Sequence, residues 1–283
     1  MALFSLLMAI LVERLKLLPS GWQFDSVIAR YQKLFWDNQS LKSEFGVAMA
    51  IVLPALLVLL ISFLLDGIFY DLLSLLFWVL ISIICFCHQS LRRVFKQYIQ
   101  AACRGDIQAC YRLAGELDCT EHLHVVDEQD LGRKVGQITA WINYRYYGAV
   151  ALYLIFLEPV GAVLYCTVRF FSDYNNKNTL EMPLVDRLLM LLDWLPSRIF
   201  SFGYVLSGQF STGLSAWRQY GLSGKTDAKT IVTYTAVAAE SLPEAGDAPL
   251  SIRSTLALLA LSKRNFVLLL TMVSVLTIFG VVS

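Results

Sequence analysis

The sequence predicts an all-α integral membrane protein: a bundle of four or five transmembrane helices, a partly inserted N-terminal helix and helical cytoplasmic segments. Hydrophobic residues make up 57% of the chain, charged residues make up 16%, and the mean hydropathy is +0.60. A soluble protein of 283 residues needs a more polar surface than this composition supplies. Long apolar runs alternate with polar segments, and the cations cluster at the ends of the runs.

The net charge of +1 gives no basic excess with which to bind a nucleic-acid backbone, so nucleic acid is not an expected partner. The six cysteines do not have the spacing of a secreted disulfide framework, and we expect free thiols. The lipid bilayer is the partner that the composition predicts.

Residues 1–45 begin with a short apolar run that ends at Glu13 and Arg14. The run lacks a preceding basic region and a following small-residue cleavage site, so it is not a removable signal peptide. It is shorter than the roughly 20 residues that cross a bilayer. We expect a partly inserted or interfacial helix, followed by a cytoplasmic segment.

Residues 46–87 are expected to form a transmembrane hairpin with arms at 46–65 and 69–87. Its turn contains Asp66 and Asp71 and no cation, whereas Lys and Arg residues flank both ends. Cations mark the cytoplasmic side, so the turn is expected to face the periplasm.

Residues 88–147 turn polar and are expected to form a cytoplasmic helical subdomain, with two amphipathic helices broken at Gly105 and Asp106. The apolar run that follows, 148–166, has Glu158 and Pro159 at its centre. This pattern predicts a kinked helix with a carboxyl group near the membrane midplane. Glu158 could serve a proton or cation relay, cap the kink, or lie at a re-entrant turn.

Membrane helices three and four are assigned to residues 148–210, although 187–210 also contains Asp193 and Arg198. Residues 211–265 form a second polar segment, expected to be cytoplasmic, and 266–283 form the last transmembrane helix. Lys263 and Arg264 face the cytoplasm only if 187–210 crosses. This favours five crossings and a periplasmic C-terminus, with four crossings as the alternative.

Charged and polar residues at membrane depth or at helix ends are the first candidate site, because such residues are costly there and often mark function. Arg14, Arg145 and Arg198 could bind an anionic or phosphorylated ligand at the cytoplasmic mouth of the bundle. In the alternative interpretation, Glu13–Arg14 and Asp193–Arg198 are structural ion pairs. The ligand-binding candidates are Glu13, Arg14, Asn143, Arg145, Asp193, Trp194 and Arg198, and Glu158 is the intramembrane carboxylate.

A weaker candidate is a metal site at Cys119, His122 and His124, since zinc binds thiolate and imidazole groups. Their spacing matches no closed structural site, and loop histidines explain them equally well. No metal site, firm cofactor or catalytic residue is predicted.

Several segments together resemble the AmpE family of inner-membrane modulators of β-lactamase induction. They are LVERLKLLPSGWQFD, YIQAACRGD, WINYRYYG, LLDWLPSR and the Lys-Arg pair before the last apolar run. The family is in turn similar to the CobD/CbiB membrane enzymes of cobalamin biosynthesis, whose Asn-Trp-Ile-Pro-Ala-Arg type motif matches Trp194, Pro196 and Arg198. The acidic stretch that those enzymes carry before their third apolar run is replaced here by WINYRYYG, with Asn143 as its amide.

The resemblance implies a multi-pass protein of the bacterial inner membrane that modulates β-lactamase induction and the response to β-lactam antibiotics, linked to peptidoglycan recycling. It also implies a role alongside the muropeptide amidase of that pathway, and a nucleotide or another anionic ligand at the cytoplasmic mouth. Two other classes stay open: a nucleotide-dependent amide-forming enzyme of the CobD/CbiB type and, ranked last, a small-molecule transporter.

Overall fold

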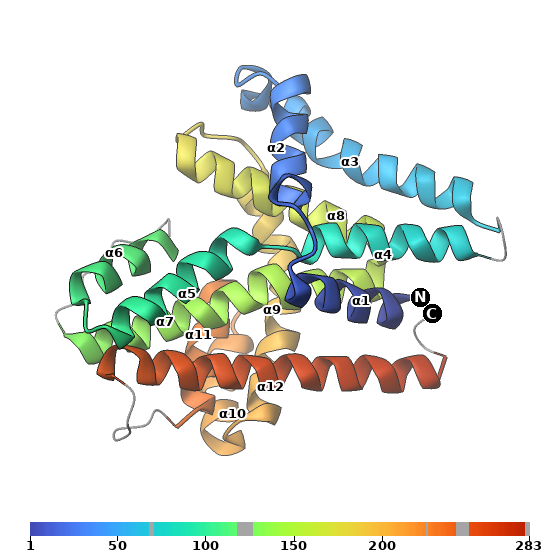
Figure 1. Ribbon diagram of the computed structural model, residues 1–283. Coiled ribbons are helices and arrows are strands. Elements are labelled where there is room, and N and C mark those ends of the chain that lie inside the picture. Colours follow the sequence, from blue (N-terminus) through green and yellow to red (C-terminus); the bar gives the residue numbers. More distant parts are fainter. Residues whose placement is uncertain (68–70, 118–126, 225, 242–248, 281–283) are drawn as a thin grey trace. The chain divides into compact units, whose positions relative to one another are not determined.

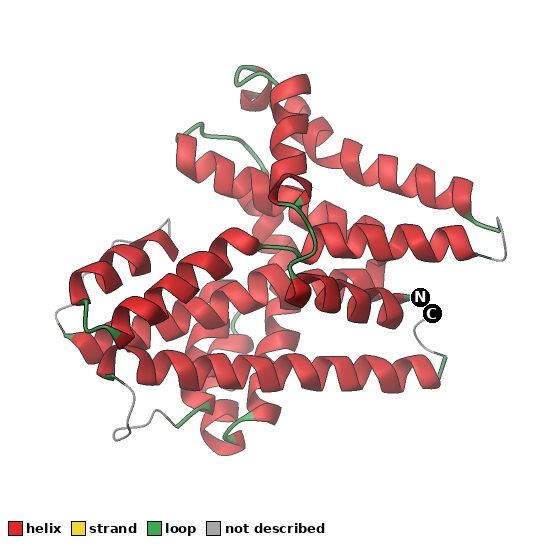
Figure 2. Ribbon diagram, viewed as in Figure 1, coloured by secondary structure: helices red, strands yellow, loops and turns green. Residues whose placement is uncertain are grey.

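The computed structural model describes residues 1–67, 71–117, 127–224, 226–241 and 249–280. All regular secondary structure in these residues is helical (Figure 2). The predicted fold class is therefore correct in its secondary structure.

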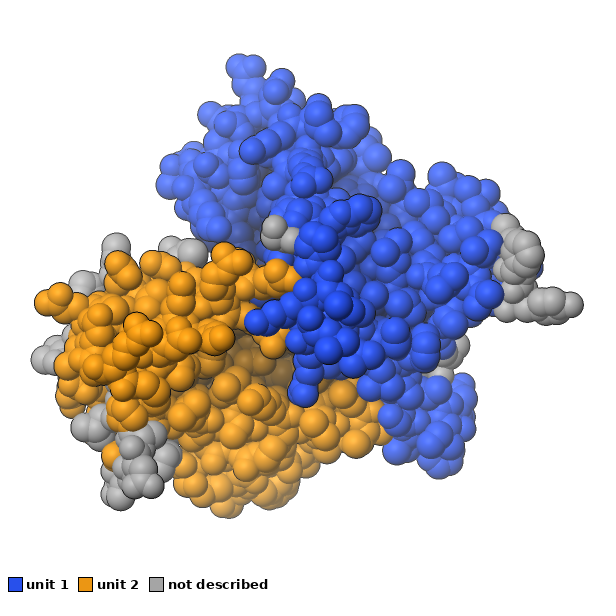
Figure 3. Space-filling model, viewed as in Figure 1, with its two compact units in different colours: residues 1–88, 149–192, 272–283 blue, residues 89–148, 193–271 orange. Residues whose placement is uncertain are grey.

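The chain forms two compact units, which we treat separately (Figure 3). Unit 1 comprises residues 1–88, 149–192 and 272–283. Unit 2 comprises residues 89–148 and 193–271. Each unit is thus assembled from segments far apart in the sequence.

Unit 1 contains the N-terminal helices, the predicted hairpin and a long broken helix (Figure 1). Its complete helices are α1 (Ala2–Leu15), α2 (Phe24–Phe35), α3 (Glu44–Leu65), α4 (Leu72–Phe86) and α8 (Ala149–Asn178), with 3₁₀ turns at Ser20–Trp22 and Ser40–Lys42. The side chain of Ser43 caps α3 by accepting a hydrogen bond from the Gly46 N–H at 3.0 Å. The helices α3 and α4 occupy the two arms expected from the sequence.

The core of unit 1 lies where the start of α3 meets the second half of α8. Val47, Ala50 and Ile51 pack with Val168 and Phe171. The helix α1 packs along α4, and α3 packs along α8. These contacts place the second half of α8 beside the end of α3 that follows α2.

The helix α8 is interrupted at Leu157 and Glu158, whose backbone angles are not helical; Glu158 has φ 58° and ψ −166°. Pro159 follows. Proline has no backbone N–H to donate a hydrogen bond, and its ring clashes with the preceding turn of a regular helix. The predicted kink is confirmed. It is a sharp reversal, since the rings of Tyr153 and Tyr165 stack with their centroids 5.1 Å apart, whereas a straight helix would separate these residues by about 18 Å.

Unit 2 contains α5 (Gln89–Cys103), α6 (Ile107–Leu117), α7 (Glu128–Asn143), α10 (Phe210–Gly221) and α11 (Ala228–Ala239). It also contains most of α9 (Val185–Ser207) and of α12 (Leu250–Ile278). The expected break between α5 and α6 is present, with Gly105 at φ +72° and the Asp106 carboxylate accepting a hydrogen bond from the Ala109 N–H. A π-helical segment, Tyr144–Gly148, follows α7.

Neutral polar side chains hold the helices of unit 2 together. The Thr255 hydroxyl donates to the Gly132 carbonyl at 2.8 Å, and the Asn265 amide donates to the Phe200 carbonyl at 2.9 Å.

The last helix is longer than the sequence predicted. The predicted span begins at Phe266, whereas α12 starts at Leu250. Lys263 and Arg264 lie on its exposed side while Leu261 is buried, so these cations do not interrupt the helix.

Three helical stretches of the described residues are long and apolar enough to cross a membrane: Glu44–Leu65, Glu128–Asn178 and Ile252–Ile278. A fourth would result if α4 and α5, bent by 41°, formed one span. The chain is therefore an all-α membrane protein, and α9 is not among these stretches. The sequence predicts four or five crossings, and the structure offers three or four candidate spans, so the two agree only at four.

Candidate functional site

The π-helical segment Tyr144–Gly148 positions a buried tyrosine against the start of the DWLPSR sequence in α9. The Tyr144 hydroxyl donates a short hydrogen bond of 2.6 Å to Asp193 Oδ1. Asp193 is 3% exposed and Tyr144 is fully buried. Gly148 permits this packing, because a Cβ atom there would collide with the Phe200 ring.

Arg198 is buried five residues after Asp193, and its guanidinium binds three main-chain carbonyls. Its Nη1 donates to Trp194 O at 2.7 Å, its Nε to Gly221 O at 2.8 Å, and its Nη2 to Ser223 O at 2.9 Å. The guanidinium lies 4.3 Å from the centroid of the Trp194 ring. An arginine has five N–H donors, so two remain for other partners.

Arg145 and Asn143 lie next to Tyr144 in the same unit. The Arg145 guanidinium is 5.9 Å from the centroid of the Trp141 ring and is partly buried. The Asn143 amide donates to the Thr139 carbonyl at 2.8 Å within α7. Unit 2 therefore contains five of the seven predicted ligand-binding candidates, and we call Asn143, Arg145, Asp193, Trp194 and Arg198 the α9 cluster.

The other two candidates, Glu13 and Arg14, lie at the end of α1 in unit 1. Glu13 is 8% exposed, and Arg14 is exposed. Glu158 lies at the α8 break and is also exposed. The structure describes no single site that contains all three predicted arginines. Cys119, His122 and His124 lie outside the described residues.

A charged cluster that the sequence did not predict lies in unit 1. Arg169 is 0% exposed, and its Nη2 atom donates to Asp25 Oδ1 at 3.1 Å and to His88 Nε2 at 3.0 Å. Because Nε2 accepts this bond, the network assigns the proton to Nδ1, which donates to the Phe86 carbonyl at 3.2 Å. His88 is therefore neutral in this arrangement.

Asp25 supplies the negative charge of this cluster from the first turn of α2. Its side chain is 44% exposed, so water also reaches the carboxylate. Partial burial raises the pKa of Asp25, but the charge and hydrogen bond of Arg169 outweigh this effect and hold the pKa below its ordinary value. The only sequence signal was Arg169 itself, a cation inside the apolar stretch TVRFF.

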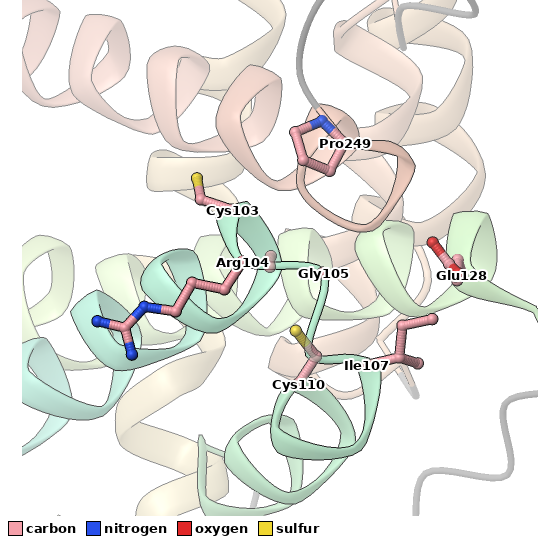
Figure 4. A pocket seen from close by; sticks show the side chains of 8 residues that line it. Cys103, Arg104, Gly105, Ile107, Cys110, Glu128 and Pro249 are labelled. Carbon is pink, nitrogen blue, oxygen red and sulfur yellow. The ribbon is translucent and has the colours of Figure 1, made fainter.

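Unit 2 also has a surface hollow of about 370 Å³ where the α5–α6 turn meets the starts of α7 and α12 (Figure 4). Its lining includes Cys103, Cys110, Glu128 and Pro249. The Arg104 side chain extends away from Glu128 and Pro249 (Figure 4). Its described lining contains none of the predicted site residues, and we base the functional argument on the α9 cluster.

The whole chain, residues 1–283, matches the family model described as "Regulatory signalling modulator protein AmpE". A curated relative, "Protein AmpE" of Shigella flexneri, is 26% identical over 288 residues, which cover 99% of each chain. No solved structure matches.

Proposed function

Because the chain belongs to the AmpE family, we propose that it is a regulatory modulator of β-lactamase induction in the bacterial inner membrane. The end-to-end family match is the observation that carries the proposal. The apolar helices support the membrane location, since three stretches have the length and composition of spans. The proposed role includes the response to β-lactam antibiotics and a link to peptidoglycan recycling.

The α9 cluster is the proposed ligand site. Trp194 is 47% exposed and Arg198 keeps two N–H donors, so an aromatic surface and a cation lie together. Such a pair suits a nucleotide or another anionic ligand, which guanidinium groups bind through paired hydrogen bonds. Arg145 is the second proposed cation, since this half-buried residue lies in the π-helical segment beside Tyr144, with its guanidinium near the Trp141 ring.

The short Tyr144–Asp193 hydrogen bond would connect this ligand site to the helix before it. Arg145 lies in the π-helical segment, next to Tyr144, whereas Trp194 and Arg198 lie on α9. A ligand bound to both elements would therefore bias how they pack. The proposed partner that detects this change is the muropeptide amidase of the same pathway, on the cytoplasmic side.

The test measures β-lactam-induced β-lactamase activity in a host that lacks the gene. Complementation uses the native chain, Trp194→Ala or Arg145→Gln, all at matched membrane abundance. The control is Trp22→Ala, because Trp22 is 57% exposed but lies in unit 1. We expect the native chain and the control to change induction and the two α9-cluster variants to lose the effect.

The outcomes separate the role from the site. If all variants act like the native chain, the modulator role stands and the assigned ligand site is wrong. If the native chain itself leaves induction unchanged, the modulator proposal fails. The remaining candidate would then be the amide-forming enzyme suggested by Trp194, Pro196 and Arg198, which nucleotide-dependent turnover by the purified protein would detect.

A further inference from the structure

The two halves of α8 lie against each other as a tight helical hairpin. Besides the stacked rings of Tyr153 and Tyr165, a Cβ atom at Gly161 would lie 3.2 Å from the Tyr153 carbonyl oxygen. In a continuous helix these two residues are about 12 Å apart along the axis. Glycine at position 161 thus permits the close approach of the two halves. Because Tyr153 lies opposite Tyr165, Ala149 lies at about the same height along the helix pair as Arg169.

The second half of α8 ends beside α2 and the α4–α5 junction. Arg169 binds Asp25 of α2 and His88, which follows α4. Five residues later, the Tyr174 hydroxyl contacts Gln32 at 3.4 Å and Asn38 at 3.3 Å. We take α3 and α4 as the transmembrane hairpin expected from the sequence. Asp25 precedes this hairpin and His88 follows it, so on that premise these partners mark the side of the membrane opposite the hairpin turn.

We propose that α8 is a re-entrant hairpin: it enters the membrane on the side where α2 lies, turns at Leu157–Pro159, and leaves on the same side. The apolar run 148–166 then does not cross. From Arg169 to Glu158 the helix rises about 16 Å, roughly half of a ~30 Å hydrocarbon core. In Figure 1 α8 likewise turns back beside α3 and α4.

Charge distribution gives independent support. The exposed cations Lys177 and Arg187 follow the α8 break. If α8 crossed, these two cations would face the periplasm, against the positive-inside rule. In the re-entrant arrangement they face the cytoplasm with Arg92 and Arg93, which follow α4. Length and composition alone admit a span here because they take no account of the reversal of the chain at Leu157 and Glu158.

The inference does not depend on the proposed regulatory role, and the sidedness of Asn176 tests it. Asn176 is exposed near the end of α8, and Asn176→Cys introduces a thiol there. Asp66→Cys, at the hairpin turn, and Ser90→Cys, after α4, are exposed controls for the two sides. Spheroplasts and inverted vesicles are treated with a membrane-impermeant maleimide, and labelling above the native chain is measured by mass spectrometry.

We expect Asn176→Cys to match Ser90→Cys, with no added label in spheroplasts and one in inverted vesicles, and Asp66→Cys to show the reverse. Labelling of Asn176→Cys in spheroplasts, like Asp66→Cys, would overturn the proposal, because α8 would then cross the membrane. Lys177→Cys, at the neighbouring exposed position, repeats the measurement if the first variant is not inserted.

Discussion

Each unit buries an arginine, but Arg169 in unit 1 is neutralised by a carboxylate, whereas Arg198 in unit 2 is surrounded by carbonyl groups. Arg169 is 0% exposed and binds Asp25 and a neutral histidine. Arg198 is 8% exposed and binds three backbone carbonyls. Stabilisation of Arg169 depends on one side chain, Asp25, which a substitution can remove. Stabilisation of Arg198 depends on backbone carbonyls, which remain when side chains are substituted. The two units should therefore respond differently to substitution.

The largest expected effect follows from breaking the charge pair at its exposed member. Asp25→Asn leaves Arg169 buried without a counter-charge, and we expect the free energy of unfolding to fall by about 3 kcal/mol. Arg169→Met should cost less, about 1 kcal/mol, because the partly exposed Asp25 can be hydrated. Chemical unfolding of the purified protein, followed by tryptophan fluorescence, measures both.

The double variant is the control for this asymmetry. Asp25→Asn combined with Arg169→Met should be more stable than Asp25→Asn alone, because the buried charge is gone. A larger loss for Arg169→Met than for Asp25→Asn would show that packing, and not charge, determines the stability of this cluster.

Arg198→Lys tests the carbonyl-bound arginine. Lysine keeps the charge, but its compact ammonium cannot reach three carbonyls spread over α9, α10 and the segment after α10. We expect a loss of about 2 kcal/mol in the free energy of unfolding. The exposed Arg218→Lys, on α10, is the matched control and should change stability by less than about 0.5 kcal/mol. Equal losses would remove the distinction between the two buried arginines.

A matched pair of tyrosines compares hydrogen bonds in the two units. The Tyr144 hydroxyl binds the Asp193 carboxylate, and the Tyr153 hydroxyl donates to the Leu192 carbonyl at 2.7 Å. Bonds to charged groups contribute more, so Tyr144→Phe should cost about 1.5 kcal/mol and Tyr153→Phe about 1 kcal/mol. The same unfolding measurement decides, and the reverse order would argue against an ionised Asp193.

The smallest expected effect is an increase in the free energy of unfolding, opposite in sign to the losses above. Gly115 is exposed inside α6, and a Cβ atom there would meet nothing within 4 Å. Gly115→Ala should stabilise unit 2 by about 0.5 kcal/mol, because alanine favours helix. A loss of stability instead would show that α6 tolerates change less than its exposure suggests.

The sequence predicted features that depend on local composition. Apolar length indicated the helices α3 and α4, Gly105 indicated the α5–α6 break, and Pro159 indicated the interruption of α8. Periodicity and punctuating residues carry this information directly. The ligand site is still a proposal; the sequence singled out its segments DWLPSR and WINYRYYG, but it did not indicate the hydrogen bond between Tyr144 and Asp193.

The rest depends on contacts between distant segments. Arg169 meets Asp25 and His88 across 144 and 81 residues of sequence, and no local pattern encodes such a meeting. The direction of the chain after Glu158 is likewise invisible to composition, since a kinked span and a hairpin have the same hydropathy. The carbonyl partners of Arg198 were missed because every residue type carries a carbonyl, so no residue identity marks them.

The π-helical segment Tyr144–Gly148 has a consequence for how this chain tolerates changes in length. A π turn holds one residue more than an α turn, because its hydrogen bonds join residues five apart. Deleting one residue here would restore the α pattern and keep the helix intact, whereas the same deletion inside α7 would rotate every later side chain by about 100°. A one-residue deletion at this turn should therefore disturb the packing of α8 less than the same deletion inside α7.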